Sequence, residues 1–277
     1  LPLKHPVNLA YEAATADLND INMIDPFHLE AYGETTVNYN RDVEIFPVLN
    51  TIFEKIYGES PYKSPTDMGV NMAGNCICDD EACREASKQE IIRRYFDALN
   101  ALAKGSTSEK EAQKIELLMN MAGITVTDRK VVIKALERAK ETDGPAAALE
   151  LRDGRIITGK TTNLLGASAA LLLNVLKVLA GIDHETHIIS PESIEPIQKL
   201  KVDYLKSKNP RLHTDEVLIA LSASAATNPQ ARLALSQLPE LAGCQAHTSV
   251  MLSDVDIKIF KKLEVQLTSE AVYEHAL

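Results

Sequence analysis

The sharpest chemical pattern in the sequence is a segment with the spacing of a phosphate-binding loop, Gly154–Thr161. It satisfies G-x-x-x-x-G-K-[ST], in which backbone N–H groups cradle phosphates and a lysine reaches them. The residues between the glycines favour a strand, and Asp153-Gly154 favours a hairpin turn, so the context argues against a wrapped loop. Two interpretations stay open: Lys160 and Thr161 bind a phosphate or carboxylate before the next helix, or they form a solvated strand end and a helix cap.

Acidic side chains gather near the beginning of the sequence. Asp25 ends the apolar stretch 21–24, and His28 follows in a polar loop. A carboxylate at a strand end could hold Mg²⁺ through water or act as a base, and an imidazole could move a proton. We therefore predict Asp25 and His28 as catalytic residues. Helix caps and surface acids explain the same cluster equally well.

A long polar stretch, 59–75, is rich in proline, glycine and side chains that form hydrogen bonds. Structured loops of this kind often hold ligands. We predict that four of its residues bind substrate: Lys63, Thr66, Asp67 and Asn71. The alternative is turn chemistry, in which these side chains bond their own backbone.

A basic turn, Lys206–His213, stands out in this acidic chain. Its cations could hold an anionic ligand against the overall field, so we predict Lys208 and Arg211 as substrate-binding residues. A solvated loop is the alternative. His247, further along, could act as an acid–base group beside this turn, or it could be a packed imidazole.

The cysteines predict no metal site. Cys76, Cys78 and Cys83 lack the doubled pairs that zinc sites normally show. Together with Cys244 they are four thiols in a long chain, which is not the composition of a disulfide-stapled scaffold. We infer a reducing cytoplasm and predict no metal ligands.

Charge and hydropathy exclude further classes. The 277 residues carry 29 basic and 39 acidic side chains, a net charge of -10, which repels phosphate backbones and argues against nucleic-acid binding. The longest apolar stretch, Leu164–Ile182, contains Asn174 and Lys177. These polar interruptions favour a buried helix over a membrane span.

The spacing of apolar residues changes from helical to strand-like near 142–145, which predicts a helix-rich region over 1–145 and an α/β domain with a mixed sheet over 146–277. The fold class is therefore α/β. The segment 215–226 could be helix or strand. The other predicted elements are helices at 42–57, 80–104, 108–121, 128–140, 167–179, 191–205 and 229–235, a hairpin over 147–158, and extended segments at 187–190, 249–252 and 263–268.

Four segments together resemble a bacterial family of uncharacterised proteins that is classed as a domain of unknown function: 1–18, 64–72, 86–95 and 207–213. Members of this family are longer, and their front half is similar to a nucleotide-binding domain with a Gly-Pro-Gly-Ser-Gly-Lys loop, which this chain lacks. The resemblance implies that the chain is the C-terminal portion and that residues 1–145 complete or extend the nucleotide-binding-like domain. It transfers no activity and no catalytic residue.

These observations predict a cytoplasmic enzyme that acts on a phosphorylated or carboxylated small molecule and depends on a nucleotide when full length. Its cofactor stays open, with ATP and Mg²⁺ as the candidates for the full-length protein. The expected partner is a small anionic ligand, with no nucleic acid and no membrane. The alternative is a non-catalytic module that binds a ligand or assembles into a homo-oligomer.

Overall fold

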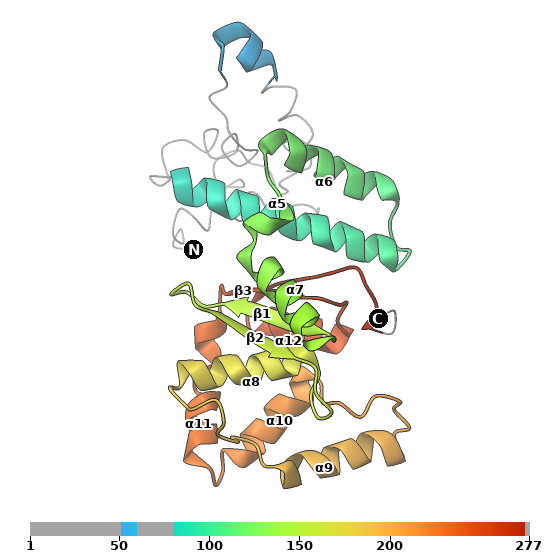
Figure 1. Ribbon diagram of the computed structural model, residues 1–277, viewed down its shortest axis with the longest axis vertical. Coiled ribbons are helices and arrows are strands. Elements are labelled where there is room, and N and C mark those ends of the chain that lie inside the picture. Colours follow the sequence, from blue (N-terminus) through green and yellow to red (C-terminus); the bar gives the residue numbers. More distant parts are fainter. Residues whose placement is uncertain (1–50, 60–79, 275–277) are drawn as a thin grey trace, which may run out of the picture. The chain divides into compact units, whose positions relative to one another are not determined.

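The computed structural model describes residues 51–59 and 80–274 (Figure 1). The chain separates into two compact units, unit 1 (Leu1–Asp128) and unit 2 (Arg129–Leu277). The sequence places the change of organisation at 145–146, where helical spacing ends. The contacts place it earlier, because helix α7 (Lys130–Thr142) packs against the sheet of unit 2.

Two antiparallel-looking helices dominate the described part of unit 1 in Figure 1, α5 (Asp80–Ala103) and α6 (Glu109–Ala122), and they pack against each other. Phe96 of α5 and Ile115 of α6 are buried. Gly123, with φ of 65°, ends α6 in the left-handed conformation that glycine tolerates. Both helices agree with the predicted segments, and residues 51–57 are helical as predicted.

Unit 2 is built on a four-stranded sheet with the order β2-β1-β3-β4. Strand β1 runs antiparallel to β2 and β3, whereas β3 and β4 are parallel. Strands β2, β3 and β4 therefore all end at one edge of the sheet, which we call the carboxyl edge. The mixed sheet confirms the predicted α/β class. The strands are β1 (Ala146–Glu150), β2 (Ile156–Lys160), β3 (Gln245–Thr248) and β4 (Gln266–Ser269).

Alternation along β1 gives the sheet two covered faces. Ala147 and Leu149 belong to the main core with helix α8 (Ala167–Leu179), whereas Ala148 packs with α7. Successive strand residues point to opposite faces, so α7 and α8 cover opposite sides. The burial of α8 agrees with the buried helix predicted for this apolar stretch. No helix in the described part of the chain is both long and apolar enough to span a membrane.

The remaining helices of unit 2 follow the sequence less closely. The predicted helix 191–205 splits into an α-helix and a π-helix, and 215–226 is helical. The predicted extended segments 187–190 and 249–252 are wrong, since both are loops. The latter is the turn from β3 into a helix that we did not predict, α12. The elements are α9 (Pro191–Lys199), the π-helix η2 (Leu200–Tyr204), α10 (Thr214–Ser224), α11 (Pro229–Leu235) and α12 (Asp254–Lys262).

The motif-like segment Gly154–Thr161 is a hairpin turn followed by β2. Gly154 has φ of 83° in the turn, and the N–H of Leu151 donates to the carbonyl of Arg155 across it. Gly159 lies directly under α8: a Cβ there would overlap the backbone of Leu171 and come 2.9 Å from the carbonyl oxygen of Ala167. Its glycine is therefore needed for close packing of strand and helix, as the strand interpretation predicted.

Candidate anion-binding site

The carboxyl edge brings together loops that are far apart in the sequence. The segments 161–166, 249–253 and 270–274 follow β2, β3 and β4, and the turn 143–145 enters β1 at the same edge. Open α/β sheets commonly bind ligands outside the carboxyl ends of their strands. This edge is therefore where a site is expected on topological grounds.

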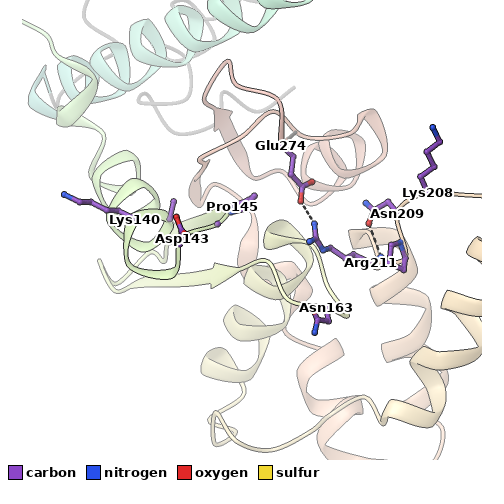
Figure 2. A pocket seen from close by; sticks show the side chains of 11 residues that line it. Lys140, Asp143, Pro145, Asn163, Lys208, Asn209, Arg211 and Glu274 are labelled. Atoms are coloured by element: carbon purple, nitrogen blue, oxygen red, sulfur yellow. Dashed lines mark hydrogen bonds and ion pairs between the residues drawn. The ribbon is translucent and has the colours of Figure 1, made fainter. Parts of the chain in front are cut away.

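A cavity of about 960 Å³ opens at this edge (Figure 2). Figure 2 shows Arg211 and Glu274 facing each other inside it, with Lys140 and Lys208 at opposite ends. Lysine and arginine thus outnumber the acids in the lining. The lining consists of 139–140, 143–145, Asn163, 208–211 and Glu274.

Arg211 is the guanidinium within the cavity. It forms an ion pair with Glu274, and both side chains are partly exposed, at 36% and 35%. The N–H of Arg211 donates to Asn209 Oδ1 at 3.1 Å, and Ser207 also bonds this turn at the Asn209 backbone. The basic turn is thus internally ordered, and it presents a guanidinium that already binds one carboxylate.

Backbone bonds fix the basic turn to the loop after β2. The N–H of Leu212 donates to the carbonyl of Leu164 at 2.9 Å, and the N–H of Gly166 donates to the carbonyl of Leu212 at 3.2 Å. Leu212 itself is buried in the main core. These contacts place Asn163 and Arg211 at one cavity and hold the segment in an extended conformation.

The π-helix η2 positions the basic turn from the inside. Lys201 is buried, and its ammonium donates to the carbonyl of Arg211 at 2.6 Å and to Glu216 Oε2 at 2.8 Å. Glu216 Oε2 in turn accepts the N–H of His213 at 2.8 Å. π-turns often occur at functional sites, and here the π-turn carries the lysine that ties Arg211 to the first turn of α10.

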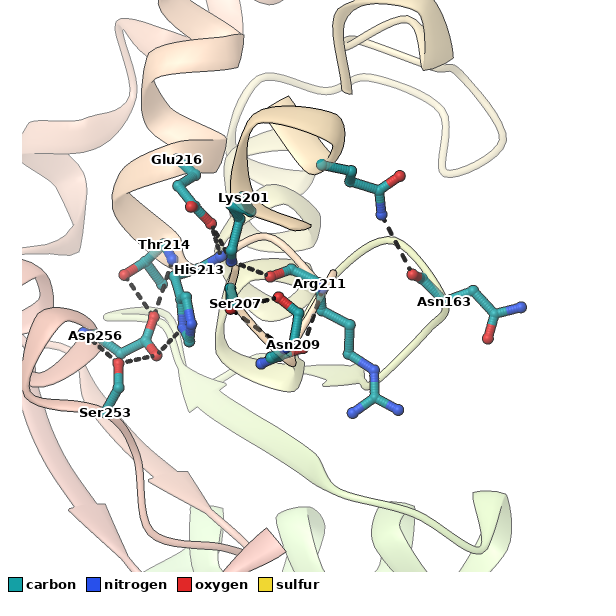
Figure 3. Close-up of polar contacts among 11 residues, drawn as sticks. Asn163, Lys201, Ser207, Asn209, Arg211, His213, Thr214, Glu216, Ser253 and Asp256 are labelled. Atoms are coloured by element: carbon teal, nitrogen blue, oxygen red, sulfur yellow. Dashed lines mark hydrogen bonds and ion pairs between the residues drawn. The ribbon is translucent and has the colours of Figure 1, made fainter. Parts of the chain in front are cut away.

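A second polar cluster joins α10 to α12 (Figure 3). Asp256 is buried and accepts four hydrogen bonds: from His213 Nδ1 at 3.0 Å, from the N–H and hydroxyl of Thr214 at 2.9 and 2.8 Å, and from Ser253 Oγ at 2.8 Å. Burial raises the pKa of Asp256, but these bonds outweigh it and lower the pKa to about 2. Asp256 is therefore an ionised acceptor at neutral pH.

Comparison with family models and relatives identifies the chain. A model described as "Domain of unknown function DUF1846, N-terminal" matches residues 1–123, and a model described as "Domain of unknown function DUF1846, C-terminal" matches residues 127–277. The chain belongs to the DUF1846 family. The gap between the two matches lies beside the division between units 1 and 2.

Relatives in the DUF1846 family are similar over nearly the whole chain. A UPF0371 protein of Corynebacterium urealyticum is 61% identical over 273 residues, and one of Corynebacterium aurimucosum is 62% identical over 273. One of Streptococcus thermophilus is 57% identical over 275 residues. The matches cover 99% of this chain and 55–56% of the relatives, so the chain spans about half of their length.

The family matches refine the expected position of the chain. The resemblance implied the C-terminal portion of a longer protein, whereas the matches show that the chain spans both DUF1846 domains. Their descriptions assign no activity, so the function of this DUF1846 chain is argued from the site.

The structure brings some of the predicted binding residues together. Lys208 and Arg211 line the cavity, and Lys160 and Thr161 do not. Thr161 is next to the lining through its backbone, since its N–H donates to the carbonyl of Pro145 at 2.8 Å. The side chain of Lys160 is exposed at the end of β2.

His247 lies inside unit 2, on the face of β3 turned away from the main core. Its side chain is fully buried, with Nδ1 2.8 Å from Thr268 Oγ1 and Nε2 3.2 Å from Glu270 Oε1. Burial lowers the pKa of His247, against the bond to Glu270, which favours the neutral imidazole. This geometry agrees with the packed interpretation of His247 and does not place it in the cavity lining.

The other predicted site residues lie outside the described residues: Asp25, His28, Lys63, Thr66, Asp67 and Asn71. Their roles stay predictions. Within the described residues of this DUF1846 chain, no group of three His, Cys, Asp or Glu side chains could hold a metal ion.

Sequence reasoning missed four cavity residues that act with Arg211 here. The turn at Asp143 was visible as a change of element, but it was interpreted only as a boundary. Lys140, Asn163 and Glu274 belong to no motif, since they meet only because three chain segments converge. Only the strand-end position of Asn163, just after β2, could have indicated it.

Proposed function

We propose that unit 2 binds a small anionic molecule, carrying a carboxylate or a phosphate, in the cavity at the carboxyl edge. The observation that carries this proposal is the half-exposed guanidinium of Arg211, which already binds the carboxylate of Glu274 inside the cavity. Arginine forms charge-assisted bonds with carboxylates and phosphates alike. A ligand anion would replace Glu274 on the guanidinium.

The surrounding charge supports the same ligand. Within the described residues, Lys140 and Lys208 have no ion-pair partner, and both line the cavity. Their charge makes this edge locally basic in a chain with a net charge of -10. Such a local field steers anions toward the cavity.

In the longer proteins of the family, we propose that this anion is the substrate of a nucleotide-dependent enzyme. The class of substrate is a phosphorylated or carboxylated small molecule, as the sequence predicts. The nucleotide, with ATP and Mg²⁺ as candidates, rests on the resemblance to a family with a nucleotide-binding front half. The predicted catalytic pair Asp25 and His28 belongs to this proposal.

Thermal melting with added anions tests the binding proposal. Inorganic phosphate or succinate should raise the melting temperature of the chain, because a ligand at 100 times its Kd adds about 2.7 kcal/mol. Arg211→Gln should remove this shift. The matched control is Arg155→Gln, which breaks a comparable exposed ion pair with Asp153 in the hairpin turn. Equal shifts in both variants would refute the proposal.

Glu274→Gln gives a test in the opposite direction. Removing the internal carboxylate should strengthen anion binding, by up to about fivefold, because an exposed ion pair contributes at most about 1 kcal/mol. Weaker binding by this variant would mean that Glu274 is part of the ligand site and not a stand-in for the ligand.

A second candidate function, assembly into a homo-oligomer, is favoured by one surface feature. Leu200, Tyr204 and Leu205, on and just after η2, are 50%, 71% and 69% exposed. Apolar side chains clustered in this way often cover an interface. Light scattering on Tyr204→Lys with Leu205→Lys tests it: a smaller mass than that of the unmodified chain supports assembly, and an unchanged mass rejects this surface.

A further inference from the structure

His213 and Asp256 form an oriented pair at the same edge as the cavity. Because Asp256 is ionised and accepts from Nδ1 at 3.0 Å, the proton of the neutral imidazole lies on Nδ1. Nε2 then carries the lone pair, or a second proton when the ring is charged. The side chain of His213 is 33% exposed, whereas that of Asp256 is 4% exposed. The pair therefore has one buried end and one end open to a ligand.

Structural need alone explains Asp256 better than His213. Thr214 and Ser253 supply three of the four bonds to the carboxylate and join α10 to α12 without the imidazole. Within the described residues, Nε2 has no hydrogen-bond partner. A histidine with its Nδ1 fixed and its Nε2 unoccupied has the geometry of a group that contacts a ligand.

The backbone connects His213 to the cavity. Residues 211–213 are extended, with Leu212 in a bridge to Leu165 and buried in the core. Side chains two residues apart in an extended chain lie on the same side, about 6.6 Å apart along it. Arg211 and His213 therefore share the side opposite Leu212. His213 is not in the cavity lining, so it extends the site beyond Arg211.

We propose that the ligand of this site is a small dianion with two separate anionic groups, one bound by the guanidinium of Arg211 and the other by Nε2 of His213. This inference rests on the proposed function, since it needs an anion at Arg211. It narrows the ligand from any small anion to a short dicarboxylate or a phosphorylated carboxylic acid.

The charges around His213 suit this role. The hydrogen bond to Asp256 raises the pKa of His213, burial opposes it, and Lys201 lowers it while Glu216 raises it, with a net upward direction. The imidazolium thus persists to higher pH than in an ordinary histidine. Affinity for a dianion should be full at low pH, where His213 is charged, and should fall as pH rises through its raised pKa.

Calorimetric titration with matched acids tests the inference. Malonate, succinate and glutarate are compared with monocarboxylates of the same lengths. At pH 6 we expect the best dicarboxylate to bind about tenfold tighter than its monocarboxylate, from one added charge-assisted bond. This advantage should decline at higher pH, and binding there should take up protons, as titration in two buffers of different ionisation enthalpy detects.

His213→Asn is the sharpest variant. The asparagine amide can replace Nδ1 as a donor to Asp256, but it removes Nε2, so the fold is kept and only the outer contact is lost. The dicarboxylate advantage and the proton uptake should both disappear, while monocarboxylate binding stays. A thermal melt of the variant checks that it is folded.

The outcomes separate the two proposals. If Arg211→Gln abolishes all anion binding but dicarboxylates show no advantage, or His213→Asn keeps that advantage, the dianion inference fails and the proposed function stands. If no acid binds, or Arg211→Gln changes nothing, both fail.

Discussion

Two lysine-bearing segments of unit 2 invite opposite conclusions from sequence and structure. Gly154–Thr161 has the spacing of a phosphate loop but forms a turn and a strand, with its second glycine pressed against α8. Lys206–His213 matches no motif but contributes Lys208 and Arg211 to the cavity. The same residue types thus have different roles, because a motif specifies spacing whereas a site depends on which segments meet.

The reason lies in what surrounds each segment. In the first, the backbone groups at its end are already bonded: the N–H of Thr161 donates to Pro145, and Thr162 Oγ1 accepts the N–H groups of Leu164 and Leu165. In the second, the backbone is fixed by Lys201 and Asn209 while the guanidinium of Arg211 stays half exposed. A site needs a fixed backbone with an accessible side chain, and only the second segment combines them.

The largest expected effect breaks the first segment. Gly159→Val should lower the free energy of unfolding by at least about 3 kcal/mol, because its side chain would overlap the backbone of α8. Urea denaturation measures it. The control is Gly144→Ala, where the nearest atom to the new Cβ is 3.8 Å away and little change is expected. Equal stability of Gly159→Val would mean that β2 and α8 are not packed as described.

The second segment should be most sensitive at its buried support. Lys201→Met should cost about 2 to 3 kcal/mol, because it leaves Glu216 and the carbonyl of Arg211 without their buried ammonium. It should also weaken anion binding, which the exposed Lys199→Met should not. Urea denaturation and a phosphate titration measure the two effects. Lost stability with unchanged anion affinity would separate Lys201 from the site.

A pH effect comes next in size. Since the pKa of Asp256 is about 2 in the folded chain and 3.8 ordinarily, its contribution of about 2 kcal/mol is full above pH 4 and is lost as pH falls toward 2. Asp256→Asn should flatten this part of the stability curve, measured by urea denaturation between pH 2.5 and 5, within the range where such titrations are informative. Asp203→Asn, at an exposed acid, should keep the slope of the unmodified chain. Parallel slopes for all three proteins would contradict the hydrogen bonds of Asp256.

The smallest effects compare the two segments directly. Lys208→Gln should weaken phosphate binding by about two- to fivefold, because a rim charge contributes little in water. Lys160→Gln should leave it unchanged, because Lys160 is absent from the lining. If Lys160→Gln has the larger effect in a titration at low salt, the motif was informative after all.

Much of the fold of unit 2 could be predicted because it depends on local pattern. The hairpin around Gly154 and the helix 167–179 follow from turn residues and apolar spacing. Helix α12 could not be recognised, since it has only 9 residues and depends on the Ser253 cap and on Asp256 bonding to α10. The π-turn at Leu200–Tyr204 also left no local signal that we used.

The candidate site could be predicted only in part. Lys208 and Arg211 were recognisable because a basic turn is unusual in an acidic chain. Glu274 and Lys140 could not be found this way, because they reach the cavity from segments more than 130 residues apart. His213 lay within the basic turn, but its value depends on Asp256, 43 residues later.

The π-turn also makes the position of Arg211 depend on chain length. A π-turn holds one residue more than an α-turn, so it has the form of a single-residue insertion into a helix. Deleting Val202 would rewind the segment as ordinary helix and rotate the following residues by about 100° relative to those before it. The spacing between α9 and the basic turn is therefore a sequence length that evolution can change only together with the binding site.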